Sequence, residues 1–215
     1  EIVDAFGNPE NFDGDKYYLH YKVCKAVDYG IPQRRERVVI IGMLNKDFDM
    51  NELFDITKRE MDNIDNYFFS PVTLRDAISD FPEPTSDGIV HLKKTISYYQ
   101  RCLRNEDGIV TNHNASNHNA LAIKRMKKVS SGENWTVLDE DIHSVHSGAY
   151  GRLEWDMPTM TITTRFDTPA GGRFIHPEAN RTLTPREAAR VQSFPDSFKF
   201  LGNKTCICKQ IGNAV

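Results

Sequence analysis

The hydrophobic positions near the start of the chain predict two β-strands. Apolar and polar residues alternate in places over residues 17–27, which is the period of a strand. Residues 38–43 form a continuous and largely β-branched run, which is typical of a strand covered on both faces of a sheet. Residues 28–32 separate the two runs and contain the Gly and Pro of a turn. We therefore expect two strands with a turn between them.

Two segments carry the signals that begin a helix. Thr73 is placed as an N-cap, with Asp76 at the third helical position. Thr184 is followed by Pro185 at the first helical position and by Glu187 at the third, which is the pattern of a capping box. Each segment is limited by a later proline, so we expect a short helix at both places.

A basic helix and a hydroxyl-rich strand are expected in the middle of the chain. Ser116 or Asn117 is placed to cap a helix that runs through Lys128. This helix has an apolar stripe, for which core packing is the favoured explanation. The stripe is formed by Ala122, Met126 and Val129. Residues 159–164, with the sequence Thr-Met-Thr-Ile-Thr-Thr, predict a β-strand.

The composition excludes several classes of protein. Hydrophobic residues make up 39% and charged residues 27% of the 215 positions, as in a soluble globular chain. The chain has no run of about 18 apolar residues, so we expect no membrane segment. The first residues lack the pattern of a signal peptide, so a cytoplasmic setting with reduced thiols is the default expectation.

The metal-binding residue types do not predict a metal site. The four cysteines contain no Cys-x-x-Cys pair, so a zinc ribbon is not expected. His143 and His146 are three residues apart, but no third ligand accompanies them. We therefore predict no bound metal.

The distribution of charge is more informative than the formal net charge of -3. Residues 44–90 contain 11 acidic and 4 basic side chains, whereas residues 91–128 contain 8 basic and 2 acidic ones. A basic segment of this kind can serve as a footprint for phosphate groups. The alternative is a solvated helix face, which charge alone favours.

Three segments in order resemble the cytosine-C5 DNA methyltransferase family. Residues 28–37, which end in Gln33-Arg34-Arg35-Glu36-Arg37 before the β-branched run, resemble its eighth motif. Residues 181–196, around the capping box, resemble the ninth motif, and residues 210–215, Gln-Ile-Gly-Asn-Ala-Val, resemble the start of the tenth. The variable target-recognition region of the family lies between the eighth and ninth motifs. The resemblance spans nearly the whole chain but only the C-terminal half of such an enzyme.

The resemblance implies roles for two arginines and for the end of the chain. These enzymes flip the target cytosine out of the duplex, and fixed cations stabilise the charge that develops on the base. By resemblance, Arg37 reaches the flipped cytosine, and Arg35 holds the region of the attacking thiolate. Gln33, Arg35 and Arg37 would share one face of an extended chain. Asn213 and Ala214 would border the S-adenosyl-L-methionine pocket, and the alternative for them is a plain turn.

The middle region is expected to bind double-stranded DNA. Basic side chains there would contact phosphates, which position a protein on DNA without specifying a sequence. Base readout requires polar side chains that reach into a groove. The candidate DNA-binding residues are Lys124 and Arg125 in the basic helix, Arg152 in a loop, and Thr161, Thr163 and Arg165 in a segment that resembles the family's recognition element.

Other family motifs do not occur in this sequence. The Phe-x-Gly-x-Gly loop that binds the cofactor, the Pro-Cys nucleophile and the Glu-Asn-Val acid are absent. We therefore expect part of a longer or two-chain DNA (cytosine-5)-methyltransferase, inactive by itself, with the N-terminal half of the enzyme as its partner. The alternative is a non-catalytic DNA-recognition subunit of a split methyltransferase. The hypothesis of a generic RNA-binding domain is weaker, because no aromatic signature of the common RNA modules is present.

The expected fold class is α/β. We expect the C-terminal strands of a Rossmann-like S-adenosylmethionine-dependent methyltransferase sheet over residues 1–75, and a small, mixed, strand-rich target-recognition domain over residues 76–175. Residues 176–215 would return to the catalytic domain. A sheet without its first strands would expose a hydrophobic edge. The implied setting is a bacterial restriction-modification system, with a cytoplasmic and DNA-associated protein.

Overall fold

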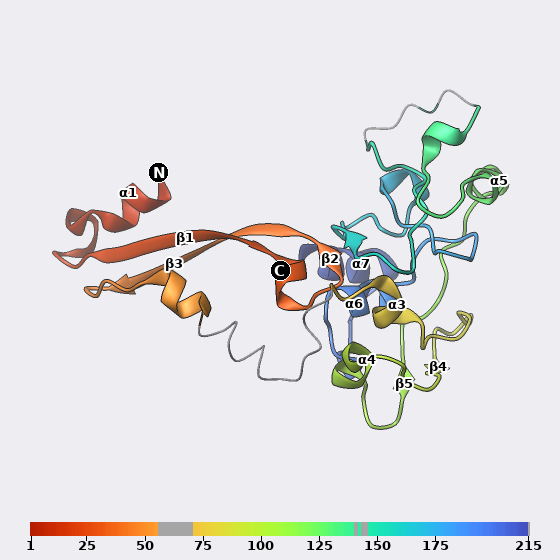
Figure 1. Cartoon of the computed structure of the whole chain (residues 1–215), viewed down its shortest axis with the longest axis horizontal. Helices are drawn as coiled ribbons and strands as arrows, with labels where there is room; N and C mark the ends of the chain where they lie inside the picture. The colour runs from red at the N-terminus through yellow and green to blue at the C-terminus, as the bar shows by residue number, and fades with distance from the viewer. Residues whose placement is uncertain (56–70, 140–141, 143–145, 215) are drawn as a thin grey trace.

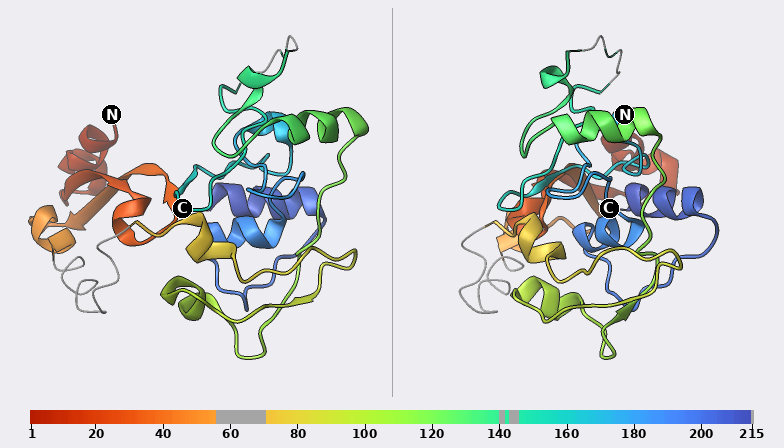
Figure 2. Two further views of the ribbon diagram at one scale, coloured as in Figure 1. Left: turned by 45° about the vertical axis from the view of Figure 1, so that its right-hand side comes forward. Right: turned by 90° about the vertical axis from the view of Figure 1, so that its right-hand side faces the viewer.

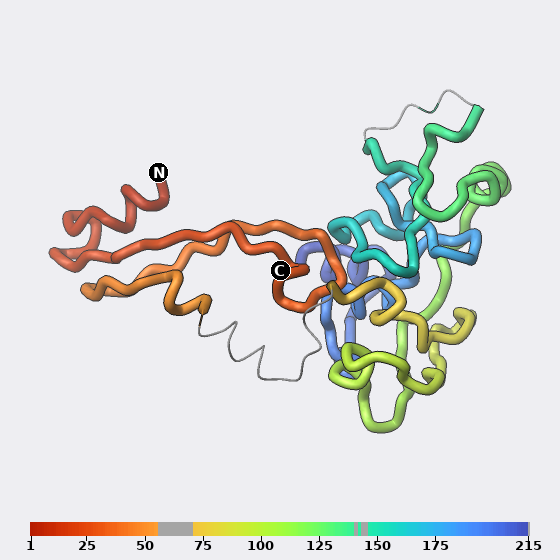
Figure 3. Tube along the Cα trace, viewed as in Figure 1, coloured from red at the N-terminus to blue at the C-terminus, as the bar shows by residue number. Residues whose placement is uncertain are grey.

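A long antiparallel hairpin extends from a body of short helices and loops (Figure 1, Figure 3). The computed structural model describes residues 1–55, 71–139, 142 and 146–214. The hairpin consists of β1 (Tyr17–Lys25) and β3 (Glu36–Leu44), which pair along their full lengths. Both predicted strands are therefore confirmed. The 3₁₀ helix η2 (Ala26–Tyr29) and Gly30, in the left-handed region with φ 70°, form the predicted turn.

Apolar side chains of the hairpin are exposed to solvent. Tyr21 is 68% exposed, Val38 is 58% exposed, and Val23 and Ile40 are also exposed. The expectation of a strand covered on both faces is thus wrong for the described residues, because the face of β3 that carries Val38 and Ile40 is exposed. With Leu44, five large apolar residues of the two strands are exposed among the described residues.

Short helices form the centre of the body (Figure 2). A hydrophobic core joins residues from Val72 to Phe174 with residues from Leu183 to Ile211. The last part of the chain therefore packs in one core with the middle part, while the domain boundaries near residues 75 and 175 stay a prediction. The helices of the body are α3 (Leu74–Ile78), α4 (Tyr98–Leu103), α5 (Ala120–Lys128), α6 (Pro185–Val191) and α7 (Lys204–Asn213).

The remaining strands are short and connect distant segments. β2 (Gln33–Arg34) pairs in parallel with β6 (Thr159–Met160), and β4 (Val90–His91) pairs with β5 (Ile109–Val110). The strand predicted over residues 159–164 therefore ends after two residues. The backbone leaves the ladder there, because the Ile162 amide donates to a side chain and not to a strand. The other short elements are α1 (Ile2–Gly7) and the 3₁₀ helices η1 (Pro9–Phe12), η4 (Trp135–Val137) and η5 (Pro169–Gly171).

The helix caps follow the sequence signals closely. The Thr73 and Thr184 hydroxyls accept from the third helical amide, and the side chains of Asp76 and Glu187 accept from the N-cap amides, so both capping boxes are confirmed. The cap of α5 is Asn119 and neither of the two residues predicted, because the Asn119 side chain accepts from the amide of Ala122, the third residue of the helix. The predicted apolar stripe of α5 is confirmed as core.

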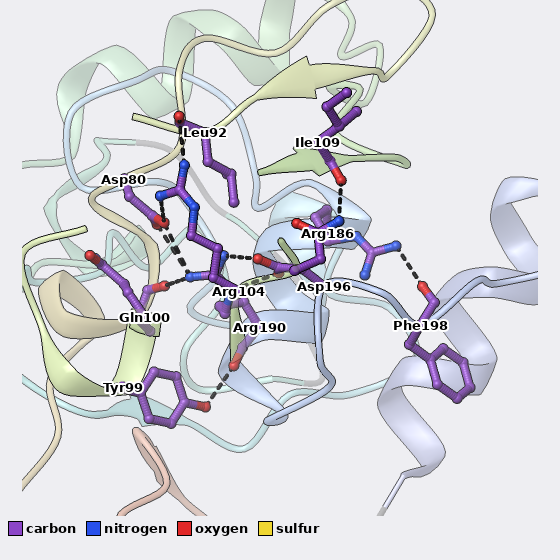
Figure 4. A network of polar contacts seen from close by, with 12 residues as sticks. Asp80, Leu92, Tyr99, Gln100, Arg104, Ile109, Arg186, Arg190, Asp196 and Phe198 are labelled. Atoms are coloured by element: carbon purple, nitrogen blue, oxygen red, sulfur yellow. Dashed lines mark hydrogen bonds and ion pairs between the residues drawn. The ribbon is translucent and has the colours of Figure 1, made fainter. Parts of the chain in front are cut away.

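A cluster of buried charges surrounds Arg190 of α6 (Figure 4). Arg190 is completely buried and donates to Asp196 from Nε at 2.9 Å and to Asp80 from Nη1 at 3.3 Å. Arg104 lies 3.7 Å from Asp80, so two arginines face two carboxylates. The Tyr99 hydroxyl donates to the Arg190 carbonyl at 2.7 Å. This cluster joins α3, α4 and α6, and it is a structural element of the body.

Candidate functional site

The junction between hairpin and body contains the first part of the candidate site. Gln33 is fully buried and Arg35 is 7% exposed, whereas Arg34 and Glu36 are exposed. The predicted alternation therefore holds over these four residues. Arg37 lies further along the hairpin, is exposed, and donates to the Glu36 carbonyl at 2.6 Å. The structure thus buries Gln33 and Arg35 and leaves Arg37 in solvent.

Arg35 is a buried cation with unused hydrogen-bonding capacity. Its Nη1 is 3.5 Å from the Ile162 carbonyl, and its Nε is buried with no hydrogen-bond partner in the described part of the chain. Burial lowers the pKa of Arg35, and the nearby charge of Arg37 lowers it further. A buried guanidinium that is only partly satisfied favours an additional acceptor.

The predicted recognition segment lies directly against the eighth motif. The Thr161 hydroxyl donates to the Arg34 carbonyl at 3.1 Å, and the Ile162 amide donates to Gln33 Oε1 at 2.8 Å. Thr161 and Thr163 are partly exposed. Two segments that are 127 residues apart in sequence are therefore fixed side by side.

Two clefts flank this contact. One has a volume of about 560 Å³ and is lined by Thr161, Thr163 and Arg173 among others. The second has a volume of about 700 Å³ and is lined by Arg35. Arg34 lines both clefts, a role that sequence reasoning missed, since an exposed arginine at a strand end carries no distinguishing local signal.

The end of α7 meets the same recognition segment from the other side. A Cβ at Gly212 would lie 2.4 Å from the Thr164 amide nitrogen, so only glycine fits this contact. Asn213 is the last residue of α7 and is exposed, and Ala214 is its C-cap and partly exposed. The alternative of a plain Gly-Asn turn is therefore wrong, because Gly212 and Asn213 are helical. Arg35 and Gly212 flank the same stretch of residues 162–164.

The basic candidates differ in their surroundings. Lys124 and Arg165 are exposed, as a phosphate or base contact requires. Arg125 lies over the Tyr150 ring at 5.5 Å and donates to the Tyr150 hydroxyl at 3.3 Å. Lys124 lies on the exposed side of α5, where Lys127 is also exposed. The arrangement leaves positive charge on this helix face.

Arg152 does not fit its predicted role as a DNA contact. It is 5% exposed, and burial lowers its pKa. Its guanidinium donates five hydrogen bonds to groups of the protein, which hold the end of α5 against a distant loop. The acceptors are the carbonyls of Met126, Val129, His176 and Ala179 and the side-chain oxygen of Asn180. We therefore remove Arg152 from the DNA-binding candidates, because all its donors are engaged inside the body.

The described residues contain no group of three or more His, Cys, Asp or Glu side chains that could hold a metal ion, and His143 lies outside them. Within the same ranges, no helix is long and apolar enough to cross a membrane.

Known structures of methyltransferases share this fold. A prophage-encoded Escherichia coli protein assigned as a DNA modification methyltransferase aligns over 96% of this chain and 58% of its own, with a TM-score of 0.67 and 26% identity. The Dnmt2 methyltransferase of S. pombe aligns over 93% of this chain and 53% of its own, with a TM-score of 0.50 and 13% identity. The fold is therefore that of part of an α/β methyltransferase.

The sequence comparisons define the family more narrowly. The profile of the C-5 cytosine-specific DNA methylases matches residues 8–215, and the chain belongs to this family. Type II methyltransferase M1.HphI of Haemophilus parahaemolyticus is 30% identical over 96% of this chain and 46% of its own length. Type II methyltransferase M.DdeI of Desulfomicrobium norvegicum is 32% identical over 91% of this chain and 51% of its own length. The chain thus spans about half the length of these curated relatives.

Proposed function

We propose that this chain is the C-terminal portion of a DNA (cytosine-5)-methyltransferase that acts on a flipped cytosine in a specific DNA sequence. The observation that carries the proposal is the convergence of Arg35 and the end of α7 on residues 162–164 of the recognition segment. Family membership supports the same assignment. Residues from three distant parts of the sequence then serve one reaction.

In the proposed reaction, the arginines act on charge. Addition of a thiolate to the cytosine ring places negative charge on the base, and a fixed guanidinium stabilises that charge. Arg37 is exposed and reaches the base, while the partly satisfied donors of Arg35 hold the region of the nucleophile. The nucleophile and the acid are supplied by the N-terminal half of the enzyme.

The end of α7 forms one edge of the proposed cofactor pocket. S-adenosyl-L-methionine supplies the methyl group when it is bound. The exposed Asn213 and the adjoining Ala214 fit such an edge, because Gly212 brings the helix end against the recognition segment. Asn213 offers an amide donor and acceptor to a polar ligand. The larger part of the pocket belongs to the N-terminal half.

The exposed hairpin is the proposed contact surface for the N-terminal half. Tyr21, Val23, Val38 and Ile40 present apolar surface that further strands and helices of a methyltransferase sheet would cover. Assembly with the missing half, in the same or a second polypeptide, would remove this surface from water.

Double-stranded DNA is the proposed substrate of the assembled enzyme. Lys124 and Arg125 are proposed phosphate contacts, because they lie on the basic side of α5. Thr161, Thr163 and Arg165 are proposed to face the bases, because two of them line the cleft next to the eighth motif.

Reconstitution tests the proposed function directly. The chain is incubated with DNA and labelled S-adenosyl-L-methionine, with and without a polypeptide that carries the N-terminal half of the family. We expect methyl incorporation only in the mixture, and a loss of at least about 100-fold in rate for Arg37→Ala with little change in DNA affinity. Arg101→Ala, an exposed arginine on α4, is the matched control and should keep the full rate at saturating DNA, because a phosphate contact by Arg101 would change only the affinity.

The outcomes separate the proposed function from its alternative. Equal rates for Arg37→Ala and Arg101→Ala would remove Arg37 from the mechanism. DNA binding without methyl transfer in the mixture would instead favour the non-catalytic recognition subunit. Methyl transfer by the isolated chain would contradict the need for a partner.

A further inference from the structure

Two glutamine side chains connect the recognition segment to α7. The Ile162 amide donates to Gln33 Oε1 at 2.8 Å, and Gln33 Nε2 donates to Gln192 Oε1 at 2.6 Å. Gln192 Nε2 then donates to the Ile211 carbonyl at 2.7 Å. We call these four groups the glutamine bridge. It joins the eighth motif, the recognition segment, α6 and α7 through three consecutive hydrogen bonds.

The ends of the glutamine bridge fix the orientation of both amides. The Ile162 end is a donor, so Gln33 presents its oxygen there and its nitrogen to Gln192. Gln192 must then accept with its oxygen, which leaves its nitrogen for the carbonyl of Ile211. A flip of either amide would place two donors or two acceptors face to face. Both side chains must therefore keep their places for either end bond to persist.

The glutamine bridge ends on the two segments that form the proposed site. The carbonyl of Ile162 lies next to Arg35, and Ile211 precedes Gly212, whose α-carbon packs on the Thr164 backbone. Gln33 is fully buried and Gln192 is partly buried, so water competes poorly for the Gln33 bonds. A displacement at one end is thus transmitted to the other.

We propose that Gln33 and Gln192 are positioning residues that set the recognition segment and the end of α7 relative to one another. The proposal rests on the function proposed above, since it makes the placement of Arg35 depend on the cofactor side of the molecule. Neither glutamine touches a reacting atom. Their effect is on the rate of methyl transfer and not on the affinity for DNA.

Gln100 provides a matched control for both glutamines. It is also completely buried, its Nε2 donates to Ser79 Oγ at 2.9 Å, and its Oε1 accepts from the Ile96 amide at 2.8 Å. It joins two segments of the body in the same manner, but it lies on α4 and outside the candidate site. The Gln100→Ala variant therefore measures the effect of losing a buried amide side chain while the glutamine bridge stays intact.

Amide hydrogen exchange in the 215-residue chain tests the transmission of position. Gln33→Ala should raise the exchange rate of the Ile162 amide by about tenfold, which corresponds to the loss of one buried hydrogen bond. Gln192→Ala should raise the same rate by a similar factor, although Gln192 does not contact Ile162. Gln100→Ala should leave it unchanged. If Ile162 exchange responds to Gln33→Ala but not to Gln192→Ala, the two side chains do not act as one unit.

Kinetics of the reconstituted enzyme test the positioning role. Gln33→Ala and Gln192→Ala should each lower kcat by about tenfold with a change in KM for DNA of less than about threefold, and the double variant should lose no more than about the larger single effect. Gln100→Ala should keep kcat within about twofold. Multiplied losses in the double variant, or an equal loss in Gln100→Ala, would overturn the proposal.

The two measurements keep this proposal distinct from the proposed function. If the wild-type mixture transfers no methyl group, the proposed function fails and the kinetic role fails with it. The exchange rates of the isolated chain still decide whether the glutamine bridge holds the two segments together. If the mixture is active but the two glutamine variants keep the wild-type kcat, only the positioning role is refuted.

Discussion

The buried charge cluster allows a sharp test of what holds the body together. Asp196→Asn keeps the size of the side chain but removes the charge that faces Arg190. Asp156 provides a matched comparison, because it accepts from Arg75 Nε at 2.7 Å and from Nη2 at 3.2 Å in the same two-bond geometry. The Asp196 pair has no exposed side-chain surface, whereas the Asp156 side chain is 79% exposed.

Burial makes the expected magnitudes very different. Asp196→Asn leaves the Arg190 charge with only one close carboxylate, Asp80, and places an amide nitrogen among guanidinium donors. Desolvation already raises the pKa of Asp80, and Arg190 counters this effect. Breaking a buried pair costs about 3–5 kcal/mol, because an uncompensated charge stays in the interior. Asp156→Asn should change little, since water screens an exposed pair.

Urea denaturation of the three chains, followed by far-ultraviolet circular dichroism, measures this difference. With a slope of about 2–3 kcal/mol per M urea, Asp196→Asn should lower the midpoint by about 1–2.5 M. Asp156→Asn should leave the midpoint close to that of the unsubstituted chain. Equal shifts for the two variants, with unchanged slopes, would refute the conclusion that burial of the pair governs its contribution.

Three further predictions follow from single residues. Burial alone would raise the pKa of Glu187, but the charge and hydrogen bonds of Arg181 lower it to about 2. The ionised Glu187 therefore stabilises the folded chain above about pH 4.5, and this stabilisation is lost as the pH falls toward 2. The free energy of unfolding should consequently fall less steeply with decreasing pH for Glu187→Gln than for the unsubstituted chain. Arg152→Lys should cost about 3 kcal/mol in urea unfolding, because several carbonyls lose their donors, with no change in the salt dependence of DNA binding. Lys124→Ala should lower the slope of log affinity against log salt by about 0.9, measured by fluorescence anisotropy with labelled duplex, and an unchanged slope would remove it from the phosphate contacts.

Local signals predicted the local structure well. The capping boxes at Thr73 and Thr184 depend on residues three positions apart, so the sequence contains all the participants. The strands β1 and β3 follow equally from short hydrophobic patterns. The cap of α5 was missed by two residues because Ser116, Asn117 and Asn119 all have side chains that can cap a helix.

Contacts between distant segments were not predictable in the same way. In the sequence, Arg152 is an arginine in an expected loop, which favours a DNA contact. Only the folded chain brings the carbonyls of Met126, Val129 and His176 around it. The β-branched run of β3 correctly predicts a strand, but it does not tell whether a strand is covered, and Val38 and Ile40 of β3 are exposed among the described residues. A sequence pattern states what a segment requires and not which segment satisfies it.

The recognition segment illustrates how the folded contacts refine a prediction made from sequence. The Thr161 hydroxyl donates to the Arg34 carbonyl, and the Thr163 hydroxyl accepts from the Arg165 amide at 3.3 Å, so both threonines take part in holding the segment. Arg165 is exposed, and its guanidinium can present two donors to a guanine edge. Since a hydroxyl that anchors the backbone is less available to a base, Arg165 is the stronger candidate for base readout and the threonines are the stronger candidates for shaping the cleft.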